Sequence, residues 1–295
     1  MILRVEMPLA YSLLSFIPNK RIRQITTANN VITSYGATAI RNMRSGSGNA
    51  QNLFGQMMNT SDKQEQKMLT DANVREEART FIIAGSDTTA ITLTYLIWAV
   101  LKQPDLQRLL EEEVAGLSEE LSLDELADAP LMNSVITETL RLYGAAPGAL
   151  PRVVPSQGLR INGHHIPGGV VVNTQAYTTH RDPRIFSEPF KYVHIQPFLI
   201  AVIKPANRPR FDGFRFMDKA YMTTERKAAY MPFGGASRSC LGLHLAYMEI
   251  RLATALFFRH CCGARLSDNM RDEMMEMENM FLISPKGHCC NITLT

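Results

Sequence analysis

The sequence predicts a mainly α-helical fold with a minor β-sheet, and three observations carry this prediction. A pattern of apolar and helix-favouring residues runs from about residue 71 to residue 103, far longer than any strand. Further helical patterns follow it, separated by prolines and glycines. Only short β-branched runs stand between these helices and near the C-terminus. With 295 residues, 45% of them hydrophobic, the chain can form a single large domain with a sizeable core.

Charge and cysteine content exclude several functions. The net charge is only +3, and no stripe of basic and aromatic residues occurs, so we expect no nucleic acid partner. The number of cysteines is odd at five, and the chain begins without a signal-peptide pattern, which favours a reducing compartment. The apolar stretch 1–18 carries Arg4 and Glu6 and so falls short of the ~18 uninterrupted apolar residues of a spanning helix. We therefore expect no membrane anchor in this chain.

The long helix is the dominant element of the pattern. It is expected to begin near Asp71 or Asn73, because Asn73 and Glu76 have the spacing of a capping box. It runs to Gln103, where Pro104 stops it. Its second half is apolar nearly all round, which predicts a central buried helix. An aspartate and three threonines within it argue against a membrane span.

The remaining elements follow from local signals in the same way. Proline at a first helical position, Asn-Gly and Pro-Gly-Gly turns, and β-branched runs are the signals used. In chain order we expect a basic helix over 20–44, a polar loop over 45–52, helices over 104–117, 121–130 and 131–143, a hairpin over 158–173, a short helix within 174–186, a helix over 241–261 and a closing strand pair within 278–295.

One cysteine stands in an unusual setting, the decapeptide FGGASRSCLG. Cys240 directly precedes the helix over 241–261, and Arg238 lies two residues before it. One interpretation is a small buried hydrophobic residue. The other is a thiolate, since the positive end of a helix and a neighbouring cation both lower the pKa of a thiol. Glycines on both sides, among them Gly242, let backbone N–H groups approach the sulfur, which is how a metal thiolate is tuned.

Two further segments carry local conflicts or charge pairs. The sequence AGSDTT interrupts the apolar helix with Gly85, which costs about 1 kcal/mol, and with Asp87 beside Thr88. Such conflicts mark functional sites, here an acid–alcohol relay; the alternative is an exposed aspartate with threonines bonded back to helix carbonyls. In ETLR, Glu138 and Arg141 share one helix face and can pair, although most such pairs are solvated and contribute little.

The segments AGSDTT, ETLR and FGGASRSCLG, in this order, together resemble the cytochrome P450 family. The hairpin ING…IPGG and the run HRDPRIF are also similar to the family, and the resemblance extends from about residue 70 to the C-terminus. It implies the C-terminal portion of the cytochrome P450 fold, with peripheral helices over 1–70 and a haem-binding core over 71–295. The segment LRLYGAAPGALPR resembles the corresponding segment of fungal members that oxidise secondary metabolites.

The resemblance implies a role for each matched residue. Cys240 would be the axial thiolate ligand of haem b, iron protoporphyrin IX. Phe233 would pack on the thiolate side of the haem, and Arg238 and Arg152 would pair with its propionates. The remaining matches are listed by role: Asp87 and Thr88 as the oxygen-activating pair, Ala84 and Gly85 as the residues that let the helix bend over the haem, and Glu138, Arg141 and Arg215 as a structural ion-pair cluster.

The implied activity is that of a haem-thiolate monooxygenase. Such an enzyme inserts one atom of O₂ into a small organic substrate and reduces the other to water, with electrons from NADPH–cytochrome P450 reductase. Three cations before the cysteine loop could help to dock the acidic reductase: Lys219, Arg226 and Lys227. The family implies the endoplasmic reticulum membrane, whereas without an anchor the chain as given would be cytoplasmic. Members that only rearrange peroxides or dehydrate tend to lack the acid–alcohol pair.

The chain departs from the family pattern at four places. Ala236 stands where glycine is preferred, which strains the backbone if φ is positive there unless Gly235 takes over, and Gly213 stands where proline is usual. Residues 192–210 form an extra segment, either an intron translated in frame or a tolerated surface insertion. The first half of the family pattern has no counterpart. The alternatives are therefore a truncated, inactive fragment that at most binds haem, or a non-haem scaffold with structural thiols.

Overall fold

The computed structural model describes residues 34–38, 41–42, 45, 70–186 and 211–294. The chain divides between Ser86 and Asp87 into two units, and each is described by itself. Of the basic helix expected over 20–44, residues 34–38 and 41–42 are helical, and the rest lies outside the described residues. The loop expected over 45–52, apart from Ser45, and the extra segment 192–210 also lie outside them.

Helix α5 spans Asp71–Leu101, which confirms the long helix and ends it two residues before the expected Gln103. Its cap differs from the prediction. The Asn73 side-chain oxygen accepts the Thr70 N–H at 3.1 Å, and the Thr70 hydroxyl oxygen accepts the Asn73 N–H at 3.2 Å. The capping box therefore pairs Thr70 with Asn73, and the expected pairing of Asn73 with Glu76 is wrong because the helix already begins at Asp71.

Burial along α5 is uneven. By length and composition, the stretch Ala72–Leu101 is the one helix among the described residues that could cross a membrane. Its last turns nevertheless enter the protein core, where Tyr95, Leu96 and Val100 are fully buried. The turn from Ala84 to Asp87 is exposed. The central buried helix is thus confirmed for the C-terminal third of α5 and wrong for its middle, because the core side chains that pack on α5 meet only its last turns.

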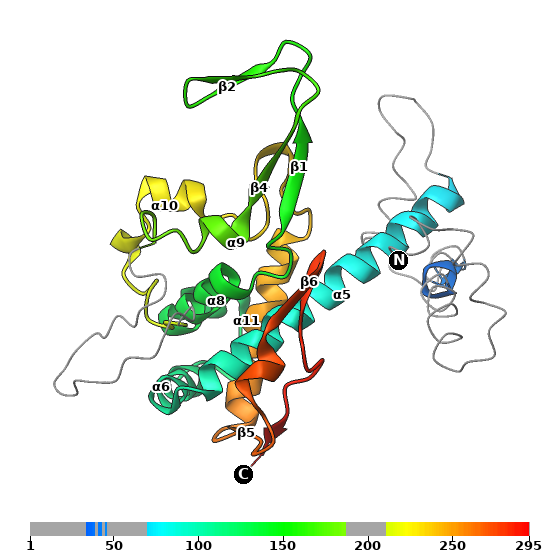
Figure 1. Ribbon diagram of the computed structural model, residues 1–295. Helices are drawn as coiled ribbons and strands as arrows, with labels where there is room; N and C mark the ends of the chain where they lie inside the picture. The colour runs from blue at the N-terminus through cyan, green and yellow to red at the C-terminus, as the bar shows by residue number, and fades with distance from the viewer. Residues whose placement is uncertain (1–33, 39–40, 43–44, 46–69, 187–210, 295) are drawn as a thin grey trace. The chain divides into compact units, whose positions relative to one another are not determined.

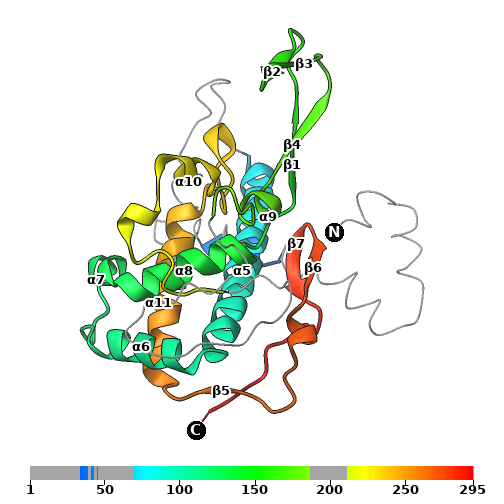
Figure 2. The same cartoon turned by 60° about the vertical axis from the view of Figure 1, so that its left-hand side comes forward.

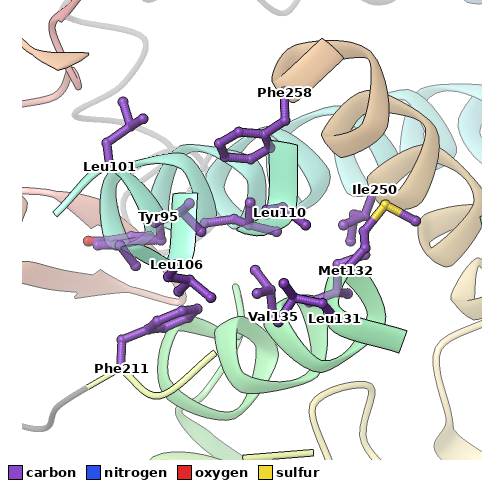
Figure 3. Close-up of a cluster of buried hydrophobic side chains, with 14 of the residues drawn as sticks. Tyr95, Leu101, Leu106, Leu110, Leu131, Met132, Val135, Phe211, Ile250 and Phe258 are labelled. Carbon is purple, nitrogen blue, oxygen red and sulfur yellow. The ribbon is translucent and has the colours of Figure 1, made fainter. Parts of the chain in front are cut away.

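The core of the second unit forms where four helices meet. Helix α6 spans Pro104–Ala115, α8 spans Pro130–Tyr143 and α11 spans Leu243–His260. The short helix α7, Leu123–Asp128, is capped by the Ser122 hydroxyl. Figure 2 shows α6, α7 and α8 gathered around α11. Buried side chains from α5, α6, α8 and α11 point toward one another, among them Tyr95, Leu106, Leu110, Met132, Val135, Ile250 and Phe258 (Figure 3).

Charged side chains from one helix cap the ends of another. The carboxylate of Glu113 on α6 accepts the backbone N–H groups of Leu131 and Met132 at 2.8 and 2.7 Å, at the start of α8. Arg259 on α11 donates to the carbonyls of Val114 at 2.8 Å and Ser118 at 2.9 Å, at the end of α6. A carboxylate at a helix N-terminus and a cation at a helix C-terminus both match the helix dipole. These contacts fix the three helices relative to one another.

The strands form two-stranded antiparallel pairs. Strand β2, Leu159–Ile161, pairs with β3, His164–Ile166, through an Asn-Gly turn with φ of 49° and 81°. Strand β1, Ala149–Val153, pairs with β4, Val171–Gln175. The single hairpin expected over 158–173 is therefore wrong in its pairing, since the run after Pro-Gly-Gly returns to β1. Figure 1 shows the β2–β3 hairpin extending from the far end of the β1–β4 pair.

The shorter elements complete the second unit. Strands β6, Met277–Met280, and β7, Leu282–Pro285, form the expected closing pair. Strand β5, Arg265–Leu266, pairs with β8, Ile292–Thr293. The remaining helical turns are α9 at Ala176–Thr179, η1 at Lys219–Tyr221, α10 at Thr224–Ala229, η2 at Ala236–Arg238 and η3 at Asp272–Met275.

Candidate active site

The cysteine loop connects α10 to α11 and places Cys240 three residues before the first residue of α11. The Cys240 N–H donates to the Phe233 carbonyl at 2.9 Å and closes the loop. The thiol is exposed, so the interpretation of Cys240 as a buried hydrophobic residue is wrong. Helix α11 begins two residues later than the expected residue 241, with Gly242 as its N-cap, and the thiolate form of Cys240 stays a prediction.

The backbone of the loop turns through the left-handed region twice. Gly234 has φ of 73°, which glycine adopts without cost. Ala236 has φ of 52°, where a Cβ meets the following carbonyl. Gly235 is extended, with φ of −166°, so it does not take over the special conformation. The strain expected at Ala236 if its φ were positive is therefore present.

Neighbouring elements hold the loop and carry its cations. The rings of Phe233 and Tyr247 lie 5.3 Å apart between centroids, which packs the loop on α11. A Cβ at Gly234 would lie 3.9 Å from the Leu150 side chain, so β1 borders the loop. Arg238 in the loop and Arg152 on β1 are both exposed, and Arg152 donates to the Pro151 carbonyl at 2.8 Å. One exposed arginine thus lies in the thiol loop and another on the strand that borders it.

Helix α5 approaches α11 through a side-chain contact. The hydroxyl of Thr89 donates to the carboxylate of Glu249 at 3.3 Å. Asp87 lies on another face of α5, where it lines a cavity of about 260 Å³ that contains no residue of the cysteine loop. The aspartate of the alternative interpretation is confirmed as exposed, while the bond back to the helix comes from a threonine outside AGSDTT, since the Thr92 hydroxyl donates to the Thr88 carbonyl at 2.9 Å. The cavity is lined by Asp87, Ala90, Ile91, Thr94, Ser284, Pro285, His288, Cys289 and Cys290.

The ETLR pair is buried and doubly hydrogen-bonded. Arg141 donates from Nε to Glu138 at 2.7 Å and from Nη2 at 2.8 Å, and both side chains are fully buried. Arg215 donates from Nε to Glu138 at 3.3 Å, and the Asp212 N–H donates to the same carboxylate at 3.1 Å. The solvated surface pair is thus wrong, and the three-membered cluster expected from the resemblance is present. Arg141 Nη1 also donates to the His180 carbonyl at 2.6 Å.

His180 is a residue of this region that sequence reasoning did not single out. Its imidazole is 1% exposed and lies between Arg141 and Met231. Burial is the main reason why the pKa of His180 is lowered to about 4, and the positive charges of Arg141 and Arg181 lower this pKa further. The ring is therefore neutral near pH 7. The only sequence signal was its place in the run HRDPRIF.

The cations considered for reductase docking differ in their surroundings. Arg226 donates to the carbonyls of Ile185 at 2.8 Å and Tyr221 at 2.7 Å, and its guanidinium lies 4.0 Å from the Tyr221 ring centroid. Its side chain thus stabilises the region before the loop. Lys219 and Lys227 are exposed. Only these two lysines remain suited to electrostatic docking.

Comparison with known proteins agrees with this geometry. The model of the family described as cytochrome P450 matches residues 2–291. The chain belongs to the cytochrome P450 family. Relatives include cytochrome P450 monooxygenase tazI of Aspergillus terreus, 46% identical over 76% of this chain and 42% of the relative, and cytochrome P450 monooxygenase stcB of Emericella nidulans, 39% identical over 83% and 43%. Cytochrome P450 monooxygenase cypX of Dothistroma septosporum is 37% identical over 94% and 51%. The chain spans about half the length of these curated relatives, or less.

The cytochrome P450 family implies haem held by a cysteine thiolate, and the loop of this chain fits that group. The only cysteine of the loop presents an exposed sulfur. A Cβ at Gly242 would lie 3.9 Å from this sulfur, and a Cβ at Gly235 would meet nothing within 4 Å, so among the described residues no other side chain crowds these two positions. The exposed arginines Arg238 and Arg152 supply the cations that two carboxylates require.

Proposed function

We propose that this chain is the haem-binding part of a haem-thiolate monooxygenase that acts on a small organic substrate in fungal secondary metabolism. The observation that carries the proposal is the exposed thiol of Cys240 just before α11, on a loop that carries the exposed Arg238 and borders the strand of the exposed Arg152. The family membership and the fungal relatives support the reaction class. The chain matches about half of those relatives, so the activity of the whole protein is part of the proposal.

Haem b would be held by Cys240 through its thiolate, with Phe233 against the ring and with Arg152 and Arg238 on the propionates. When bound, the haem supplies the activation of O₂. A thiolate is the form that ligates a metal.

Residues of α5 would transfer protons and would leave open space beside the helix. Asp87 is exposed and can take up protons from solvent, and Thr88 follows it on the helix, so the pair would pass a proton toward the reacting atoms. Gly85 has nothing within 4 Å of the position of a Cβ, which leaves the helix surface open beside Ala84. Glu138, Arg141 and Arg215 would hold α8 against the segment after residue 211, behind the loop.

The partners and location follow from the same reaction class. Electrons would come from NADPH–cytochrome P450 reductase, an acidic protein for which Lys219 and Lys227 present exposed positive charge. The family is commonly associated with membranes, and we propose the endoplasmic reticulum membrane as the location.

The test of this proposal is an absorption spectrum of the haem-supplemented protein, reduced and exposed to carbon monoxide, beside Cys240→Ser. The proposal expects a strongly red-shifted Soret band that the mutant lacks, because only thiolate ligation gives this shift. An unshifted band, or no haem uptake by the unmodified chain, would overturn it. Cys262→Ser is the matched control, since this thiol is also exposed but donates to Glu111 at 3.2 Å.

A second candidate function is haem binding without substrate turnover. It is favoured by the share of the relatives that this chain matches, 42% to 51%. Reductase-supported oxidation of NADPH separates the two candidates once the Soret band has been observed. Consumption of NADPH with oxygen inserted into a substrate supports the monooxygenase. A red-shifted band without any consumption supports the binding fragment.

A further inference from the structure

The imidazole of His180 connects the buried ion pair to the cysteine loop. Its Nδ1 lies 3.0 Å from the Arg141 carbonyl oxygen, and its Nε2 lies 2.8 Å from the Met231 backbone nitrogen. A backbone N–H can only donate, so Nε2 must be unprotonated and accept. Nδ1 then carries the hydrogen and donates to Arg141. Two backbone groups from segments far apart in the sequence thus determine one neutral tautomer.

Packing holds this ring in place. The Tyr230 ring stacks on His180 with centroids 5.3 Å apart and an interplanar angle of 19°, and Phe186 contacts it edge-on at 6.1 Å. The connection to Arg141 is reciprocal, because Arg141 Nη1 donates to the His180 carbonyl at 2.6 Å. The imidazole therefore has no freedom to leave Met231 unless the ion-pair region moves with it.

Met231 is the point from which the cysteine loop starts. The Gly234 N–H donates to the Met231 carbonyl at 3.1 Å and forms the first turn of the loop. The Cys240 N–H donates to the Phe233 carbonyl, within that same turn. A shift of Met231 would thus be passed to Phe233 and from there to Cys240. The Tyr230 hydroxyl, which donates to the Thr137 carbonyl at 3.1 Å, holds the preceding residue on α8.

We propose that His180 is a positioning residue that transmits the geometry of the Glu138–Arg141 pair to the thiolate loop through Met231. Its importance for the iron ligand rests on the proposed haem-thiolate function, while its effect on the loop backbone does not. The charged groups that face the ring are Arg141 from α8 and the adjacent Arg181, and both oppose a second proton on it. A neutral acceptor at Nε2 is thereby maintained for Met231.

The experiment compares three variants of the full chain. His180→Phe keeps an aromatic ring for Tyr230 but loses both hydrogen bonds. His180→Asn keeps a donor near the Arg141 carbonyl and loses the acceptor for Met231. His180→Gln has the reach to offer an amide oxygen to the Met231 N–H. The matched control is His164→Phe, because His164 is exposed on β3.

The first readout is hydrogen exchange of peptides that cover residues 228–241, measured without haem. We expect exchange about fivefold faster in His180→Phe and His180→Asn, the factor that corresponds to one backbone hydrogen bond. Partial restoration in His180→Gln and no change in His164→Phe are expected. Exchange that stays unchanged in His180→Asn overturns the proposal. If His180→Phe does not fold, equal exchange in the Asn and Gln variants overturns it.

The second readout is the spectrum of the reduced carbon monoxide complex. A displaced loop weakens thiolate ligation, so we expect a larger share of the unshifted Soret band in His180→Asn than in His180→Gln. Equal shares in both variants, with haem bound, overturn the transmission to Cys240. If the unmodified chain takes up no haem while exchange still responds to His180→Asn, the proposed function fails and the control of the loop by His180 stands.

Discussion

Arg215 and Glu138 lie 77 residues apart in the sequence, and Arg215 Nε lies 3.3 Å from a Glu138 oxygen in the fold. The same carboxylate accepts two hydrogen bonds from Arg141, which lies three residues further along α8 on the same face of the helix. One buried anion thus compensates two buried cations. Buried charges are tolerated in a protein interior when each has a partner, and the buried Asp212 is a second anion near Arg215.

Glu138→Gln should lower the free energy of unfolding by about 3 to 5 kcal/mol, because it removes the buried carboxylate that pairs with Arg141 and Arg215. Urea unfolding of the purified chain measures this loss. Glu112→Gln is the matched control, since Glu112 pairs with Arg108 at 2.6 Å while 60% of its side chain is exposed. The control should lose less than about 1 kcal/mol. Equal losses in the two variants would contradict the structural role of Glu138.

The buried His180 predicts a dependence of stability on pH. Its pKa is about 4 in the folded chain and 6.5 when unperturbed, so between these values the unfolded chain binds more protons than the folded chain. The contribution of the neutral imidazole to the free energy of unfolding is complete above about pH 6.5. About 3 kcal/mol of it is lost as the pH falls toward 4. Unfolding curves at several pH values check this. The extra slope should be missing from His180→Gln, and an identical slope in both proteins would refute the assignment.

Ala236→Gly should raise stability by up to about 1 kcal/mol. At φ of 52° the Cβ of an alanine costs about 1 to 2 kcal/mol, and glycine avoids this strain. Part of the gain in stability is lost again, because glycine has more conformational freedom in the unfolded chain. Ala228→Gly provides the control, because Ala228 lies in helix α10, where glycine costs about 1 kcal/mol. Thermal unfolding should therefore move in opposite directions in the two variants. A loss of stability in both would show that Ala236 is not strained.

Gly213→Ala should destabilise the protein by about 1 to 3 kcal/mol through overpacking. A Cβ at Gly213 would lie 2.6 Å from a Leu106 methyl group and 3.0 Å from one of Val135, and both side chains are fully buried. The contrasting variant is Gly85→Ala, where nothing lies within 4 Å and the helix should gain about 1 kcal/mol. The denaturant midpoints of the two variants, compared with that of the unmodified chain, measure these changes in stability. A neutral Gly213→Ala would mean that the core can yield at Leu106.

Local signals explain what the sequence could predict. The helices α6, α8 and α11 follow from proline starts and apolar periodicity, and the pairing of Glu138 with Arg141 follows from their spacing on one helix face. These interactions lie within one element, where the period of the helix decides which side chains meet. The resemblance added Arg215, which no local pattern connects to Glu138.

Long-range contacts explain what the sequence could not predict. The partner of β4 is β1, and their pairing depends on how the chain folds back after the Pro-Gly-Gly turn rather than on the composition of either strand. The role of His180 depends on Met231, 51 residues away. Whether Asp87 and Thr88 act together also depends on groups brought to α5 by tertiary structure, so their relay stays a prediction.

The ion pair also has a consequence for the segment 187–210. Phe186, the last described residue before it, lies against Arg141, with 5.6 Å between the guanidinium carbon and the ring centroid. Asp212, just after it, donates its N–H to Glu138. Each partner of one salt bridge thus holds one flank of the segment in place. We therefore expect that an epitope tag or a fluorescent reporter inserted within 187–210 leaves the register of the described elements on either side unchanged, because the closure entropy of a flexible connection grows only slowly with its length.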